Sequence, residues 1–154
     1  MTVAAIPSAF DLAHCIPDLK PKRRDAALAE LVGLAHQSGS VREAEPLLDL
    51  LLLRERLGTT AIGKCVAVPH ARSLTVVRSQ LVVARSKRGV DWNAPDGQPI
   101  QLILLVLSPA EATDAAHQGF LARAVAVARL QRNRQKLLDA PSFEIAQRMR
   151  ELVS

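Results

Sequence analysis

Aromatic side chains are almost absent from this chain: three of its 154 residues are phenylalanine, one is tryptophan and none is tyrosine. The core must therefore be built from leucine, valine, isoleucine and alanine. The same scarcity argues against a protein that stacks the bases of single-stranded nucleic acid, because such proteins need aromatic platforms. A composition of 49% hydrophobic and 23% charged residues is nevertheless typical of a globular chain rather than a disordered one.

Cysteine is also scarce, and the common metal and nucleotide motifs are missing. Cys15 and Cys65 lie far apart without Cys-x-x-Cys spacing, which indicates reduced thiols rather than a disulfide framework. The chain has no His-Glu-x-x-His motif and no close pair of histidines, so we expect no metal site. Walker A, Gly-x-Gly-x-x-Gly and Gly-x-Ser-x-Gly motifs are absent too. We expect the protein to need no cofactor.

No apolar run is long enough to cross a bilayer, and the first ten residues lack the basic start of a signal peptide. We therefore expect a cytoplasmic protein without stable membrane insertion. The net charge of +5 comes from cations spread over several separate stretches, including Arg85 to Arg88 and Arg129 to Lys136. Since no nucleic-acid-binding motif accompanies them, we interpret these stretches as a solvated basic face and expect no nucleic-acid partner.

Hydrophobic periodicity predicts an α/β or α+β fold in three layers, formed by a single domain over residues 1–154. The apolar strands should be covered by helices on both faces. Ser142 is the expected N-cap of the last helix, and Pro21 is placed in the first turn of the first one. We expect helices at 20–35, 43–57, 113–130, 134–138 and 142–152, and strands at 65–68, 79–86 and 100–107.

The stretch GTTAIGKCVAVPHARS, residues 58–73, contains the strongest candidate for chemistry. It places His70 at the end of an apolar, strand-like run that follows a polar glycine loop. Pro69 fixes its own φ and biases Val68 toward an extended conformation, so the imidazole should be exposed at a strand end. A neutral imidazole there is a competent nucleophile toward phosphorus. Arg54 and Arg56 lie upstream, either as phosphoryl ligands or simply as the polar face of a helix end.

The stretch RERLGTTAIGKCVAVPHA, residues 54–71, resembles the active-site signature of a known family. These are the IIA domains of the fructose–mannitol type in the phosphoenolpyruvate-dependent sugar phosphotransferase system, which typically read Arg-Glu and then S-T-G-I-G-x-G-I-A-I-P-H-[AG]. Residues 89–109 resemble the family's turn leading into a hydrophobic strand that ends in proline. His117 falls where the family has its second histidine, and the resemblance extends over residues 5–153.

The resemblance implies a mixed sheet flanked by helices, and a protein that accepts a phosphoryl group on a histidine nitrogen. The donor would be the phosphocarrier HPr or its nitrogen-branch counterpart. His70 matches the phosphorylated position and His117 the second active-site histidine, carried on the first turn of a helix with unpaired N–H groups. Arg54 would balance the phosphoryl charge. The residues expected to bind the phosphoryl oxygens are Thr59, Thr60 and Gly63.

The motif departs from the family pattern, as does the helix after His117 at Gln118-Gly119, where an apolar residue is more usual, and three roles remain open. Ala61 replaces a permissive glycine, while Lys64 and Cys65 stand where a small polar residue and a glycine are usual. The chain could be a regulatory protein of the nitrogen type, which acts through its phosphorylation state on a target protein. It could instead be a transport component that passes phosphate to a IIB domain, or an interaction module that is no longer phosphorylated. The absence of an attached IIB, IIC or HPr domain favours the regulatory role.

Overall fold

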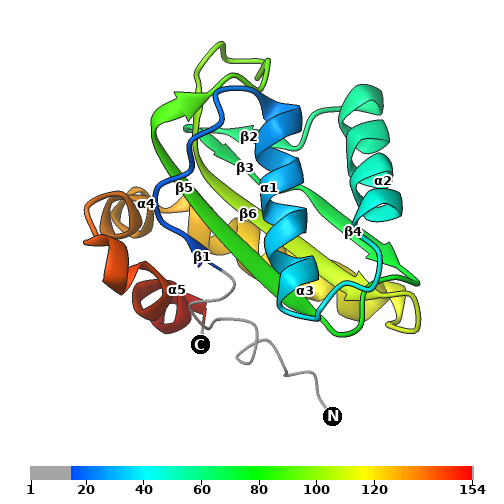
Figure 1. The fold of residues 1–154 in the computed structure, drawn as a ribbon. Coiled ribbons are helices and arrows are strands. Elements are labelled where there is room, and N and C mark those ends of the chain that lie inside the picture. Colours follow the sequence, from blue (N-terminus) through cyan, green and yellow to red (C-terminus); the bar gives the residue numbers. More distant parts are fainter. Residues whose placement is uncertain (1–14, 154) are drawn as a thin grey trace.

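The computed structural model describes residues 15–153, in which six strands form one mixed sheet between two layers of helices (Figure 1). The expectations for the first fourteen residues, including the absence of a signal peptide, lie outside the described residues. The helices are α1 (Arg24–Gln37), α2 (Ala44–Leu57), α3 (Asp114–Arg129), α4 (Gln131–Leu138) and α5 (Ile145–Val153), with a 3-10 turn at Ser142–Glu144. The strands are β1 (Cys15–Ile16), β2 (Ala61–Gly63), β3 (Val66–Ala67), β4 (His70–Ser73), β5 (Gln80–Val90) and β6 (Ile100–Pro109). The predicted fold class is confirmed.

The long antiparallel pair β5–β6 forms the centre of the sheet, whose order is β1-β5-β6-β3-β2. On the side away from β5, strand β6 pairs in parallel first with β3 and then with β4. Ala67 is opposite Ile103 and His70 is opposite Val106, so both strands advance by three residues and the register is kept. The sequence predicts that the strand ends at His70. It is interrupted at Pro69, which has no N–H to donate, and resumes at His70.

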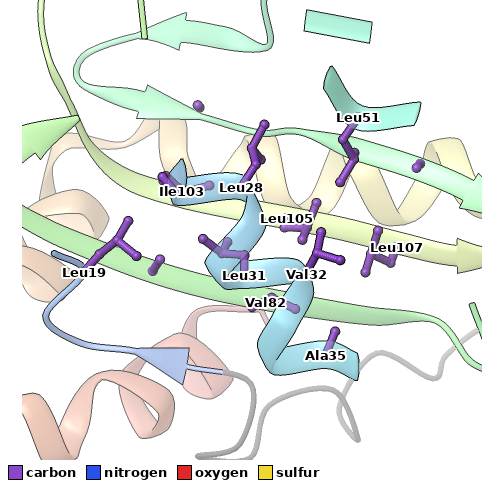
Figure 2. Close-up of a cluster of buried hydrophobic side chains, with 14 of the residues drawn as sticks. Leu19, Leu28, Leu31, Val32, Ala35, Leu51, Val82, Ile103, Leu105 and Leu107 are labelled. Atoms are coloured by element: carbon purple, nitrogen blue, oxygen red, sulfur yellow. The ribbon is translucent and has the colours of Figure 1, made fainter. Parts of the chain in front are cut away.

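Strand β6 is buried along almost its whole length because helices cover both of its faces. Successive side chains of a strand point to opposite sides. Ile103, Leu105 and Leu107 therefore join one core cluster with α1 and α2, and the intervening side chains join a second with α3, α4 and α5. Figure 2 shows the first cluster, in which Leu28 and Leu31 of α1 pack over the sheet. The prediction of apolar strands covered on both faces is confirmed.

The first helix begins at Arg24 rather than at residue 20, because the residues before it run beside β5. The Leu19 N–H donates to the Arg85 carbonyl at 2.8 Å, and the Lys22 carbonyl accepts from the N–H that follows β5, at 2.7 Å. These bonds hold the segment extended. The placement of Pro21 in a helical turn is therefore wrong.

Three further boundaries differ from the sequence prediction, and one of them is the start of α4, which lies at Gln131 rather than at residue 134. Ser142 does not cap the last helix: its hydroxyl donates to the Asp18 carboxylate at 3.0 Å, and α5 begins only at Ile145, after the 3-10 turn. Strand β5 continues to Val90 because the backbone bulges between Arg85 and Val90 and then pairs again with β6.

Arg85 is fully buried, so its assignment to a solvated basic face is wrong. Its guanidinium donates to the carbonyls of Pro17, Leu137 and Leu138 at 3.0 to 3.2 Å, and to that of Ala140 at 2.5 Å. Three of these carbonyls belong to the end of α4 and the residues just beyond it, where backbone oxygens have no partner within the helix. A single side chain of β5 therefore fastens the end of α4 to the sheet.

The polar glycine loop predicted before residue 65 is a hairpin rather than a loop. Strands β2 and β3 pair antiparallel, and Lys64 and Cys65 form the two-residue turn between them, with φ of 57° and 65°. Two-residue hairpin turns of type I′ need positive φ at both central positions, which Asn-Gly meets most easily. Ala61 is extended, so the loss of the family's glycine there causes no strain, whereas Cys65 carries the cost of a left-handed conformation.

Replacement of Cys65 by glycine should therefore stabilise the protein, by up to about 1 kcal/mol in the free energy of unfolding, because glycine adopts positive φ without steric cost. The greater entropy of glycine in the unfolded chain offsets part of the gain. Urea unfolding followed by circular dichroism would measure the change. The control is Cys65→Ala, which keeps the left-handed strain; an equal gain in that variant would assign the effect to the thiol instead.

Candidate functional site

The structure brings together the two histidines that lie 47 residues apart in the chain. His70 is the first residue of β4 and His117 is the fourth residue of α3. The His70 Nδ1 and His117 Nε2 atoms are 3.4 Å apart, and the tilted rings have centroids 5.6 Å apart. His117 is buried, whereas His70 is only half-buried. His70 is therefore the member of the pair that a molecule from solvent can reach.

Ser108 forms a hydrogen bond with the ring of the buried His117. The sequence analysis did not identify this serine. Its hydroxyl lies 2.7 Å from His117 Nδ1, and both residues are buried. Ser108 is near the end of β6, where the sheet meets the start of α3. The hydrogen bonds thus form a line from Ser108 through His117 to His70, and they fix which nitrogen of each ring faces its neighbour.

Arg54 lies close enough to His70 for its charge to act on the imidazole. It belongs to the last turn of α2, and together with His70 it lines a hollow of about 440 Å³. Arg56 is not part of this lining. The remaining lining residues are Leu57, Gly58, Thr59, Thr60, Ile62, Val68, Leu121 and Val125. The hollow therefore combines one cation and one imidazole with a largely apolar rim.

Glu55 organises the loop between α2 and β2, and the sequence analysis noticed it only as part of the Arg-Glu pair. Its carboxylate is buried and accepts from the Thr60 N–H and from the Trp92 indole N–H, each at 3.1 Å. The hydroxyls of Thr59 and Thr60 also donate to it. A buried carboxylate with this many donors has its charge well compensated.

These contacts give the loop residues a structural role. Thr59 and Thr60 border the hollow, but their hydroxyl protons are directed to Glu55 rather than toward His70. Gly63 is not in the lining; it precedes the hairpin turn with φ of 90°, a conformation that favours glycine. The expectation that these three residues bind the phosphoryl oxygens through hydroxyl and backbone N–H donors remains a prediction. They shape the loop.

The start of α3 also differs from expectation. Its first turn is capped by Thr113, whose hydroxyl oxygen accepts from the Ala116 N–H at 3.0 Å. The His117 N–H donates to the Thr113 carbonyl at 3.0 Å. The N–H groups of these two residues are therefore already paired, and His117 contributes its side chain to the site rather than a free backbone donor.

Both histidines are kept neutral by their surroundings. The pKa of His70 is lowered from its ordinary value first by burial, then by the charges of Arg54 and His117, against the opposing effect of Glu55. The pKa of His117 is lowered by burial and by Arg72. A neutral imidazole keeps a lone pair on one nitrogen, which is the state that a nucleophile needs.

Nuclear magnetic resonance titration of the ring protons should give midpoints for His70 and His117 below about 6.5, the value of an unperturbed histidine. Since the unfolded chain then binds more protons than the native one, the free energy of unfolding should decrease as the pH falls below about 6.5. The same titration in urea supplies the reference. Midpoints at or above the urea value would contradict the proposed neutral pair.

These features describe a small α/β protein with two histidines facing each other at one edge of its sheet. Residues 9–149 match the family described as the phosphoenolpyruvate-dependent sugar phosphotransferase system, EIIA 2, and the chain belongs to this family. In the part of the chain between residues 15 and 153, no three histidine, cysteine, aspartate or glutamate side chains are grouped so that they could hold a metal ion. None of the helices there combines the length and apolar character that a membrane crossing requires.

The proteins similar to this chain have two kinds of name, nitrogen regulatory protein and sugar-specific EIIA component. A nitrogen regulatory protein of Bradyrhizobium diazoefficiens is 38% identical over 118 residues, 77% of this chain and 74% of that protein. The fructose-specific EIIABC component of Bacillus subtilis is 28% identical over 125 residues, 81% of this chain but only 20% of that much longer protein. The crystal structure of the nitrogen regulatory protein IIA-Ntr from Neisseria meningitidis superimposes with a TM-score of 0.84 and 26% identity, covering 96% of this chain and 98% of that one.

Proposed function

We propose that this protein accepts a phosphoryl group on His70 from an HPr-like phosphocarrier. The single observation that carries the proposal is the pairing of a half-exposed, neutral His70 with a buried His117 beside the hollow lined by Arg54. Membership of the EIIA family supports it. The facing histidines also argue against a module that no longer carries phosphate, because such a module would not need them.

Nε2 of His70 is the nitrogen that we propose to be phosphorylated, since Nδ1 already faces His117. Its lone pair attacks the phosphorus of the carrier's phosphohistidine, forming a new N–P bond as the old one breaks, and the donor ring keeps the electron pair. This requires the proton of neutral His70 to be on Nδ1, where it is donated to His117 Nε2. His117 then has its own proton on Nδ1, donated to Ser108. Positioning and charge balance, rather than further covalent chemistry, carry the transfer.

Arg54→Ala should slow acceptance of the phosphoryl group more than Arg56→Ala does. On a helix these side chains are about 200° apart, and only Arg54 lines the hollow with His70. An arginine facing the phosphoryl oxygens compensates the charge of the incoming group. Time courses of phosphorylation with a limiting carrier would measure the two rates. Equal, small reductions would show that both arginines are surface charges.

A regulatory role of the nitrogen type is the role we favour, with a target protein as the downstream partner. The support is a nitrogen regulatory relative that is 38% identical, together with the close superposition on IIA-Ntr. The alternative is transport, in which the phosphoryl group passes to a IIB domain. Transfer from the phosphorylated protein to purified IIB domains of the fructose and mannitol type would distinguish the two roles.

Mass spectrometry after incubation with phosphoenolpyruvate, enzyme I and a phosphocarrier tests the proposed function. One added phosphoryl group is the expected result, and it should depend on all three additions. Leaving out the carrier is the matched control, because it tests whether the group comes through the carrier. A folded protein that gains no phosphoryl group from either HPr or a nitrogen-branch carrier would overturn the proposal.

A further inference from the structure

The second half of α3 and all of α4 carry positive charge and no carboxylate. Between Asp114 and Asp139 there is no carboxylate, but there are five cations: Arg123, Arg129, Arg132, Arg134 and Lys136. The guanidinium of Arg123 donates to the Val153 carbonyl and that of Arg134 to the Ala128 carbonyl. Within residues 15–153 the side chains of the other three cations form no hydrogen bond or ion pair. Their charges therefore remain available to another molecule.

A groove of about 710 Å³ runs between α3, α4 and α5 next to these cations. Arg123, Arg132 and Lys136 are among its lining residues, and Glu151 is the only carboxylate there. Leu130, which is 45% exposed although it is a large hydrophobic residue, also lines the groove, together with the partly buried Leu152 and the polar Asn133. The groove therefore combines positive charge with an exposed leucine side chain.

This groove and the His70 hollow lie on different sides of the same helix. Leu121 and Val125 of α3 line the hollow, whereas Arg123 and Ala126 line the groove. Successive helical residues are about 100° apart, so Arg123 projects about 200° from Leu121. Figure 1 shows α4 and α5 grouped with α3 on the side of the sheet opposite α1 and α2. A molecule in the groove would not need to cover His70.

We propose that the groove between α3, α4 and α5 docks an acidic segment of a partner protein, with carboxylates on the basic rim and an apolar side chain against Leu130. Opposite charge guides association and excludes wrong partners, and the apolar contact supplies the area that is removed from water. The exposed Leu130 favours a protein segment over nucleic acid, because the lining has no aromatic side chain on which bases could stack. Docking here leaves the phosphoryl site open to its own partner.

Chemical-shift mapping tests this site with a defined probe: a helical peptide with leucine on one face and glutamate on the other. The expected result is a set of shifted amide signals confined to the second half of α3, to α4 and to α5, weakening at high salt as the charges are screened. The double variant Arg132→Glu/Lys136→Glu should weaken binding by about tenfold or more. Arg78→Glu is the control, since Arg78 is also exposed but lies elsewhere on the surface.

The proposal would be overturned by an absence of shifts, by shifts centred on other elements, or by equal affinity in the double variant. Binding to a glutamine version of the peptide with the same affinity would also contradict it, as would tighter binding to single-stranded DNA or to phosphatidylglycerol vesicles. His70→Ala should bind the peptide like the wild type. Failure of the groove and failure of the phosphoryl site are therefore measured separately.

Discussion

Replacement of His70 by alanine should abolish phosphorylation by the carrier, because no other imidazole in the site is accessible. His117 is buried, and its ring is enclosed between Ser108 and His70. The wild-type adduct should be a phosphoramidate, which is labile in acid and stable in base. Intact-mass measurement after acid and base treatment would show both the presence and the chemical type of the modification.

His36→Ala is the matched control for this experiment, since His36 is an exposed histidine at the end of α1, outside the site. It should become phosphorylated like the wild type. An acid-stable modification, or a phosphoryl group that persists in folded His70→Ala, would contradict the assignment of His70 as the phosphorylated residue.

Removing the imidazole of His117 should slow phosphoryl transfer by a factor of order 10², comparable to the loss of one aligned donor or acceptor at a reacting centre. His70 would remain in place on β4, but its Nδ1 would lose the partner that lies 3.4 Å away and fixes its tautomer. Rapid-quench measurements of transfer in both directions would give the rates. Wild-type rates in both directions would identify His117 as a structural residue only.

Ser108 provides a graded companion to that variant. Ser108→Ala should slow transfer less than His117→Ala does, because the imidazole stays but loses the bond at Nδ1. Ser108→Thr keeps a hydroxyl and should restore most of the rate. The nitrogen chemical shifts of the His117 ring should change in Ser108→Ala and return to their wild-type values in Ser108→Thr. If Ser108 had only a structural role, these shifts would stay the same in both variants.

Local patterns in the sequence were sufficient for the layered fold. The unbroken apolar run of β6 predicted a strand covered on both faces, and the helical periodicity predicted α2 and α3 to within one residue at each end. Family resemblance was needed to connect His70 with His117, because no local pattern links residues that meet only through the pairing of β4 with β6 and the return of α3.

Contacts between distant segments could not be predicted in the same way. Glu55 meets Trp92 across 37 residues, and Arg85 meets the end of α4 across more than 50. The local sequence does not show that Glu55 and Arg85 are buried, because judged from their sequence neighbours alone both residues resemble surface charges. The hairpin was missed because its turn uses Lys64 and Cys65 at positive φ, where Asn-Gly would have been recognisable.

The bond between Trp92 and Glu55 gives the protein a natural optical probe. Trp92 is the only tryptophan of the chain, and there is no tyrosine to contribute to the emission. Its indole N–H donates to the same carboxylate oxygen that accepts from the Thr60 N–H, on the loop that borders the His70 hollow. Any rearrangement of that loop should change the polarity around the indole and shift its fluorescence. Phosphorylation and carrier docking could then be followed in stopped-flow experiments without a dye or a label.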